Sequence, residues 1–61
     1  MKKVYILKDS VAVADAINEI INRSLAYAIE TTPLLYFAFE LTIECDPSDI
    51  AEIEEILAPV I

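Results

Sequence analysis

The run from Leu34 to Cys45 constrains the fold more than any other part of the chain. Every second residue from Leu35 to Cys45 is apolar, and this period of two predicts a β-strand with one continuous buried face. The opposite face changes halfway, because Leu34, Tyr36 and Ala38 are followed there by acidic and polar residues. A straight strand of this length spans roughly 40 Å, whereas a globule of this size has a radius of gyration of about 10–11 Å. We therefore expect the strand to bend, or its two-sided half to be covered by another subunit.

A first strand is predicted at residues 3–8, before a helix. Both faces of this stretch are apolar, so we expect the strand at the centre of a sheet or between two layers. Asp9 and Ser10 then offer helix caps, and apolar side chains recur at spacings of three and four from Val11 onward. The pattern predicts a strand followed by an amphipathic helix.

The end of this helix has two interpretations. In the first, the apolar stripe runs to about Glu30, and the helix stops at residues 31–33. In the second, the helix stops near Asn22, and residues 25–30 form a strand that turns back through residues 31–33 into the long strand. The continuing stripe and the alanines favour the longer helix.

A second helix is predicted after the long strand. Asp46 suits the N-cap and Pro47 the first helical position, while Pro59 ends the apolar stripe that follows. The fold class is therefore α+β, with a single domain over residues 1–61. The element order is β-α-β-α, or β-α-β-β-α under the hairpin interpretation. Two or three strands pack against two helices, and we expect homodimerisation to complete the layers.

The apolar content predicts that part of the hydrophobic surface lies between chains. Hydrophobic residues make up 57% of the sequence, above the 45–50% of ordinary domains. A chain this short buries only about 60% of the surface that its unfolded form exposes, and its one cysteine excludes an internal disulfide. We expect a homodimer or higher oligomer, with an interface at Leu34, Tyr36, Ala38, Val60 and Ile61.

The charge of the chain points to a basic protein as the second kind of partner. Eleven acidic residues against four basic ones give a net charge of −7. This balance argues against direct contact with nucleic-acid phosphates and against an anionic membrane surface. The long strand and the second helix are joined by a tight turn, so we expect their acids to form one negative partner-binding surface: Glu40, Glu44, Asp49, Glu52 and Glu55.

The residues available for catalysis are few. The chain has no histidine, the commonest general base, and no glycine for a phosphate-binding loop. Cys45 lies on the apolar face of its strand, so we interpret it as a small buried hydrophobe rather than a thiolate activated by the next helix. We therefore expect no enzymatic activity, no cofactor and no metal site.

These features predict a small acidic protein-binding module that blocks the surface of another protein. Non-enzymatic inhibitors or regulators, for example phage or mobile-element anti-defence proteins, have this size and charge, and mimicry of nucleic acid by the acids is one form of the hypothesis. The alternative is a structural or dimerisation subunit of a larger assembly. A cytoplasmic location is expected, because a lone thiol fits a reducing compartment and no apolar run is long enough to span a bilayer.

Overall fold

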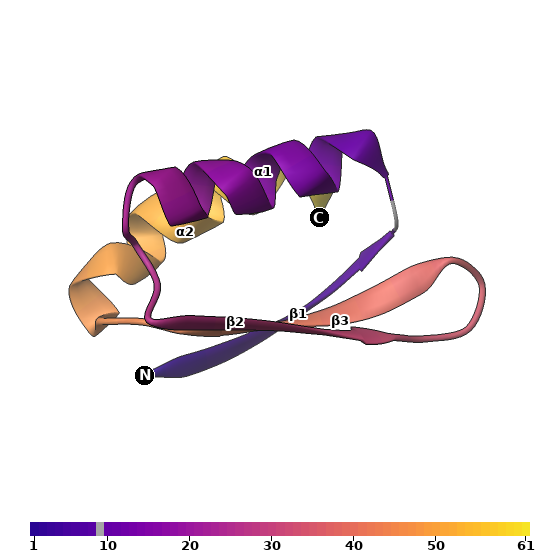
Figure 1. The fold of residues 1–61 in the computed structure, drawn as a ribbon, viewed down its shortest axis with the longest axis horizontal. Helices are drawn as coiled ribbons and strands as arrows, with labels where there is room; N and C mark the ends of the chain where they lie inside the picture. The colour runs from indigo at the N-terminus through magenta and orange to yellow at the C-terminus, as the bar shows by residue number, and fades with distance from the viewer. Residues whose placement is uncertain (9) are drawn as a thin grey trace.

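Three antiparallel strands form one sheet, and two helices lie on one of its faces (Figure 1). The computed structural model describes residues 1–8 and 10–61. The order along the chain is β-α-β-β-α, as the hairpin interpretation predicted. The elements are β1 (Lys2–Lys8), α1 (Val11–Asn22), β2 (Ala28–Pro33), β3 (Ala38–Glu44) and α2 (Ile50–Leu57).

The central strand is β3, which pairs with both other strands. Leu41 of β3 lies opposite Tyr5 on one side and Thr31 on the other. The expectation that residues 3–8 form a central or sandwiched strand is wrong, because β1 is an edge strand. Its Val4 and Ile6 side chains are 53% and 59% exposed on the sheet face away from the helices.

The preferred interpretation of a helix reaching Glu30 is also wrong. Helix α1 ends because Ser24 takes a left-handed backbone conformation with φ of 55°. The Ser24 N–H donates to the Ile21 carbonyl at 3.0 Å, and the Leu25 N–H donates to the Ile20 carbonyl at 3.1 Å. This pair of bonds is the Schellman arrangement, with serine in the position that usually holds glycine. The buried Leu25 side chain fixes the exit of the chain toward β2.

The long strand expected from Leu34 is shorter than predicted. Strand β3 begins at Ala38, and residues 34–37 form the turn of the β2–β3 hairpin. Residues 31–33, expected as the turn, instead belong to β2 and pair with β3. The second half of the prediction is confirmed, because Leu41, Ile43 and Cys45 point into the core with no exposed surface.

Local capping signals are largely confirmed. The Ser10 hydroxyl accepts a hydrogen bond from the Val13 N–H at 3.3 Å and caps α1, while Asp9 lies outside the described residues. Pro47 opens a short 3₁₀ helix, η1 (Pro47–Asp49), that leads into α2. The Asp46 side chain makes no capping bond there.

The core lies between the sheet and the two helices. Helix α2 buries Ile53 and Leu57, as its predicted stripe requires, whereas Ile21 of the α1 stripe is 56% exposed. Cys45 is a free, fully buried thiol, which confirms its predicted packing role. The buried apolar residues are Leu7, Val13, Ala16, Ile20, Leu25, Leu41, Ile43, Cys45, Ile53 and Leu57.

Charged side chains close two margins of this core. Between the helices, Arg23 contacts the Glu19 carboxylate at 2.6 Å and the Glu52 carboxylate at 3.0 Å. Between β1 and α2, the Tyr5 hydroxyl donates to Glu54 at 3.1 Å, and the Lys3 ammonium lies 3.8 Å from the same carboxylate. These exposed contacts each contribute little free energy, but they mark the sides on which the layers are sealed.

The Tyr5 contact predicts a pH dependence of stability. Burial, followed by the hydrogen bond to Glu54, raises the pKa of Tyr5 from 10.0 to about 12. Since the folded-state pKa lies above the unfolded value, this contribution to stability is fully present below pH 10 and is lost as the pH rises toward 12. In urea unfolding, Tyr5→Phe should therefore lose less stability than the wild type between about pH 8 and about pH 11. Tyr36→Phe is the control, since Tyr36 is 93% exposed, and it should behave as the wild type. An identical decline in all three proteins would contradict this role of Tyr5.

Candidate functional site

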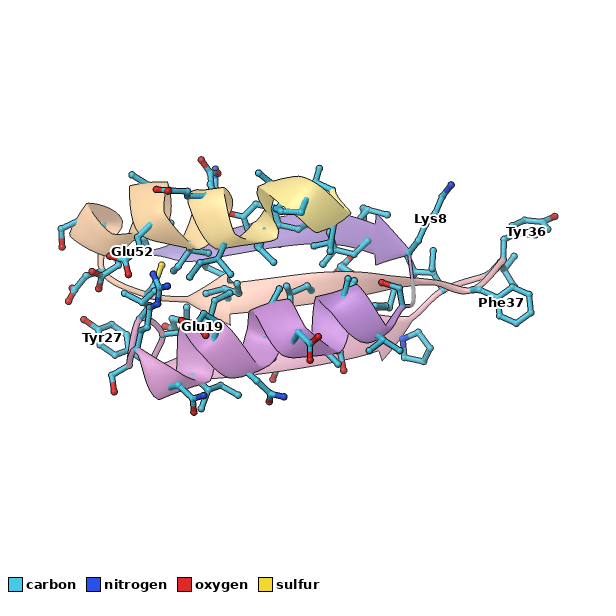
Figure 2. The ribbon with its side chains drawn as sticks, turned by 90° about the horizontal axis from the view of Figure 1, so that it is seen from above. Lys8, Glu19, Tyr27, Tyr36, Phe37 and Glu52 are labelled. Atoms are coloured by element: carbon cyan, nitrogen blue, oxygen red, sulfur yellow. The ribbon has the colours of Figure 1, made fainter. Side chains whose placement is uncertain are left out.

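The β2–β3 hairpin ends in four consecutive apolar residues, Leu34–Phe37, which we call the hairpin tip. The Leu34 N–H donates to the Ala38 carbonyl at 2.9 Å, and the Ala38 N–H donates to the Leu35 carbonyl at 3.4 Å. Figure 2 shows the tip reaching past the ends of the helices, with the rings of Tyr36 and Phe37 at its extremity. The tip is therefore held in place by main-chain bonds and not by packing on the body of the protein.

The backbone of the hairpin tip is costly for its residues. Tyr36 and Phe37 have φ angles of 61° and 58°, so both lie in the left-handed region. Two successive residues with positive φ match the twist of a hairpin, and this turn strongly prefers Asn-Gly. An L-residue with a bulky side chain pays about 1–2 kcal/mol in that region. The sequence thus places two aromatic residues where the fold alone would favour small ones.

Three of the four side chains of the hairpin tip are largely exposed to water. Leu35, Tyr36 and Phe37 are 79%, 93% and 88% exposed, and Leu34 is 43% exposed. Single exposed apolar residues are common on protein surfaces, but contiguous groups mark interaction sites. Tyr36 and Phe37 thus cost backbone energy and gain almost no burial in the isolated chain. We take the hairpin tip as the candidate functional site.

The residues predicted for an oligomer interface separate into two groups. Leu34 and Tyr36 belong to the hairpin tip. Ala38, Val60 and Ile61 instead line a hollow of about 430 Å³ with residues from the end of β1. Ala38 connects the two groups along the chain, because it follows the tip directly and forms hydrogen bonds with Leu34 and Leu35.

The predicted acidic surface is also divided. Glu40 and Glu44 flank the buried Leu41 and Ile43 in β3, so the alternation of the strand directs their side chains to the face away from the helices. The other members, Asp49, Glu52 and Glu55, lie in η1 and α2 on the opposite face. The tight turn does connect the elements as expected, but the sheet stands between the two sets of carboxylates.

Glu52 has an intramolecular partner. Its carboxylate accepts from Arg23, and this hydrogen bond, with a second one to Glu19, raises the pKa of the Arg23 guanidinium. Part of the negative charge on α2 is therefore neutralised within the chain. We treat the acids as a modulator of association and not as the centre of a site.

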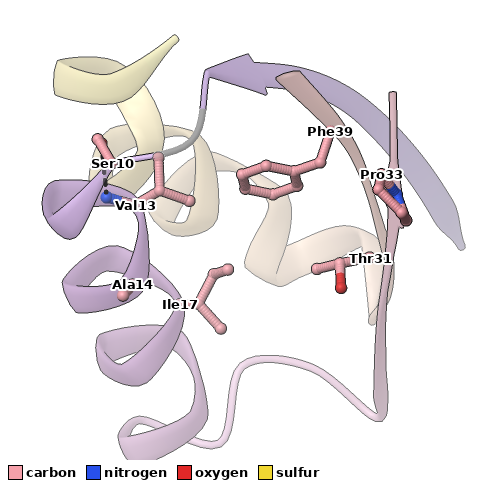
Figure 3. A pocket seen from close by; sticks show the side chains of 7 residues that line it. All are labelled: Ser10, Val13, Ala14, Ile17, Thr31, Pro33 and Phe39. Atoms are coloured by element: carbon pink, nitrogen blue, oxygen red, sulfur yellow. Dashed lines mark hydrogen bonds between the residues drawn. The ribbon is translucent and has the colours of Figure 1, made fainter. Parts of the chain in front are cut away.

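A second apolar feature lies on the side where α1 faces the edge strand β2. A hollow of about 400 Å³ opens there (Figure 3). Its helix side consists of Ser10, Val13, Ala14 and Ile17, and its sheet side consists of Thr31, Pro33 and Phe39. Such a lining can contact apolar side chains, but it has few groups that could orient a polar substrate.

The described residues provide little for catalysis or metal binding. Over residues 1–8 and 10–61, no group of three or more His, Cys, Asp or Glu side chains lies close enough together to hold a metal ion. The Cys45 thiol is fully buried, so a substrate cannot reach it without opening of the core. Within the same part of the chain, neither helix has the length and apolar character needed to cross a membrane.

Comparison with known proteins gives no family for this chain. No protein-family model, no curated protein sequence and no solved structure matches it significantly. Assignment of a function therefore depends on the surfaces described above.

The hairpin tip is visible in the sequence as an apolar segment, but its pattern predicts a strand instead of a turn. The alternation of Leu35, Phe37 and Phe39 has the period of a strand, and no Gly, Asn or Asp marks a turn. A weak signal for the true strand lies in residues 31–33. Thr31 and Thr32 are β-branched, and Pro33 is tolerated in an edge strand, so these residues suit a strand that turns after them.

The backbone of the hairpin tip predicts that its natural sequence is not its most stable one. Replacing both aromatic residues, Tyr36→Asn with Phe37→Gly, should raise the free energy of unfolding by about 1–2 kcal/mol, because the new residues accept positive φ. Urea unfolding measures the change. Leu35→Asn is the matched control, since it removes an exposed apolar side chain without relieving backbone strain. A less stable double variant would show that the rings contribute contacts within the free protein.

Proposed function

We propose that this protein is a non-catalytic protein-binding module that inserts its hairpin tip into an apolar pocket of a partner protein. The observation that carries the proposal is the pairing of near-complete exposure with a costly backbone at Tyr36 and Phe37. A fold keeps such a feature when binding, rather than stability, selects it.

The energetics of the hairpin tip suit this role. Full burial of a large apolar side chain contributes about 1.5–3 kcal/mol, and aromatic residues are the commonest binding hot spots. The turn already holds Tyr36 and Phe37 at the end of a hydrogen-bonded hairpin, so little backbone entropy is lost when they bind. A few residues can therefore supply most of the affinity of a small binder.

A protein pocket fits the hairpin tip better than a membrane does. The net charge of −7 opposes approach to anionic lipid surfaces. Glu40 and Glu44 on the open sheet face would then favour partners with a basic rim and act on the rate of association. A module of this kind acts as an inhibitor or regulator by occupying the pocket of its partner. A permanent subunit of a larger assembly would use the same contact and differ in the lifetime of the complex.

We also propose that the working form is a homodimer. The exposed apolar side chains extend beyond the hairpin tip to Val4, Ile6, Ile21 and Tyr27. A short chain with this much apolar surface in water has little stability to spare. Association of two copies would cover part of that surface and present two tips.

Affinity capture with matched variants tests the proposed contact. Immobilised wild type and the charge-reversed Glu40→Lys, Glu44→Lys variant should both retain the same partner from an extract of the source cells. The Tyr36→Asn, Phe37→Gly variant should retain at least about 100-fold less, the loss expected when two hot spots are removed. A photoreactive analogue in place of Phe37 should then cross-link to the purified partner.

Two results would overturn the proposal. One is equal retention of the purified partner by the hairpin-tip variant and the wild type. The other is loss of binding in the charge-reversed variant alone, with strong dependence on salt, which would assign the contact to the acidic face instead.

A further inference from the structure

The three margins where layers meet are closed differently. Arg23 bridges the two helices through Glu19 and Glu52, and Glu54 ties α2 to β1 through Tyr5 and Lys3. The third margin, where α1 faces β2, is the α1–β2 flank. Among the described residues, none of those lining its two hollows carries a charge. In a chain with a net charge of −7, these two hollows thus have uncharged linings among the described residues, and Glu30 of β2 belongs to the open face of the sheet.

Apolar side chains from α1 line this flank. Ala14, Ile17 and Ile21 follow one another at spacings of three and four and form a row along the helix. The acids Asp15 and Glu19 lie more than about 100° around the helix from Ile21, because each turn takes 3.6 residues. Ile21 is 56% exposed and lines the second hollow, which lies at the other end of the flank from the hollow in Figure 3. The α1 part of the flank is therefore apolar from Ala14 to Ile21.

Strand β2 gives the same flank a free hydrogen-bonding edge. It is the outer strand of the sheet, and its Leu34 neighbour donates to Ala38 of β3. Hydrogen-bonding direction alternates along a strand, so the main-chain groups of Ile29 and Thr31 point away from β3. Pro33 can accept but not donate at this edge. Main-chain donors and acceptors at the outer edge of a sheet can form hydrogen bonds with a further strand.

We infer that a second copy of this chain covers the α1–β2 flank by antiparallel pairing of the two β2 strands, which extends both sheets into one. The inference rests on the proposed dimerisation and places its interface. A two-fold axis through Thr31 sets Glu30 opposite the partner's Thr32, so no two carboxylates face each other directly. The same axis brings together the two α1 rows above the joined sheet. A register shifted by one residue would reverse the faces, and one shifted by two residues, with the axis through Glu30, would set Glu30 against its own copy.

A second copy fits this flank for two reasons. Like-charged chains limit their repulsion when they meet where the linings are uncharged, and an antiparallel strand edge can pair with its own copy about a two-fold axis. The flank faces the viewer in Figure 1, where the molecule measures 32 by 19 Å. The flank therefore runs along the longest dimension of the molecule, which carries both the β2 edge and the α1 row.

A pair of isoleucine variants tests the inference. Ile21→Lys places a charge on the flank, while Ile6→Lys, 59% exposed on the open sheet face, is matched in residue type and exposure. Light scattering after size exclusion should give twice the chain mass for the wild type at about 50 μM. Ile21→Lys should raise the dimer dissociation constant at least about 100-fold, and Ile6→Lys should change it less than about threefold.

Hydrogen exchange gives a second measurement that does not depend on a variant. The amides of Ile29 and Thr31 should exchange more slowly above the dissociation constant of the dimer than after dilution below it. The amides of Val4 and Ile6, on the outer edge of β1, serve as the control and should not change with concentration.

The outcomes separate the two proposals. A monomeric wild type at about 50 μM would overturn both the homodimer and this interface. A dimer that survives Ile21→Lys, or that Ile6→Lys or the hairpin-tip variant dissociates instead, would overturn the interface while leaving dimerisation in place.

Discussion

The alternation along β3 is the constraint on which the rest of the structure depends. Leu41, Ile43 and Cys45 occupy every second position, have no exposed surface and lie beneath both helices. Because β3 pairs with β1 and β2, this one row fixes the register of all three strands and the face on which the helices pack. Its opposite row, with Glu40 and Glu44, leaves the second face of the sheet to solvent. The fold is one-sided for that reason.

Because the chain has no glycine, its positive φ angles fall on residues for which that conformation is costly. The chain takes positive φ at Ser24, Tyr36 and Phe37, positions that glycine or asparagine would fill at lower cost. At Ser24 the cost is offset by the two bonds that end α1 and by the burial of Leu25. At the hairpin tip the aromatic side chains remain in water, and no comparable gain is present within the chain. The two sites obey the same backbone rule, but only the first is explained by folding.

Sequence patterns predicted the parts of the fold that local chemistry determines. The Ser10 cap, the Pro47 start and the buried side of α2 follow from residue type and spacing. Residue pattern alone could not predict the end of α1, since alanines and a continuing stripe are compatible with a helix to about Glu30. Tertiary pairing with β3 decided it. The hairpin tip was identified as unusual. Its alternating aromatic residues have the period of a strand, however, so the residue pattern alone does not locate the turn.

The interaction surfaces were harder to predict than the elements. The acids are near one another in sequence, yet the sheet divides Glu40 and Glu44 from those of α2, because successive side chains in a strand point to opposite faces. The α1–β2 flank combines residues that are distant in sequence, from Ala14 to Phe39, so no local pattern predicts it. The uncharged linings of its two hollows follow from which side chains α1 and β2 turn toward each other, and that depends on the tertiary structure.

If a second copy completes the fold, as we propose, the stability of the protein should depend on its concentration. Thermal unfolding followed by circular dichroism from about 1 to about 100 μM tests this most directly. For a dimer, we expect the unfolding midpoint to rise by roughly 5 °C or more over that range, since mass action favours the folded dimer. A midpoint that is independent of concentration, together with a cooperative transition, would show that the monomer is sufficient.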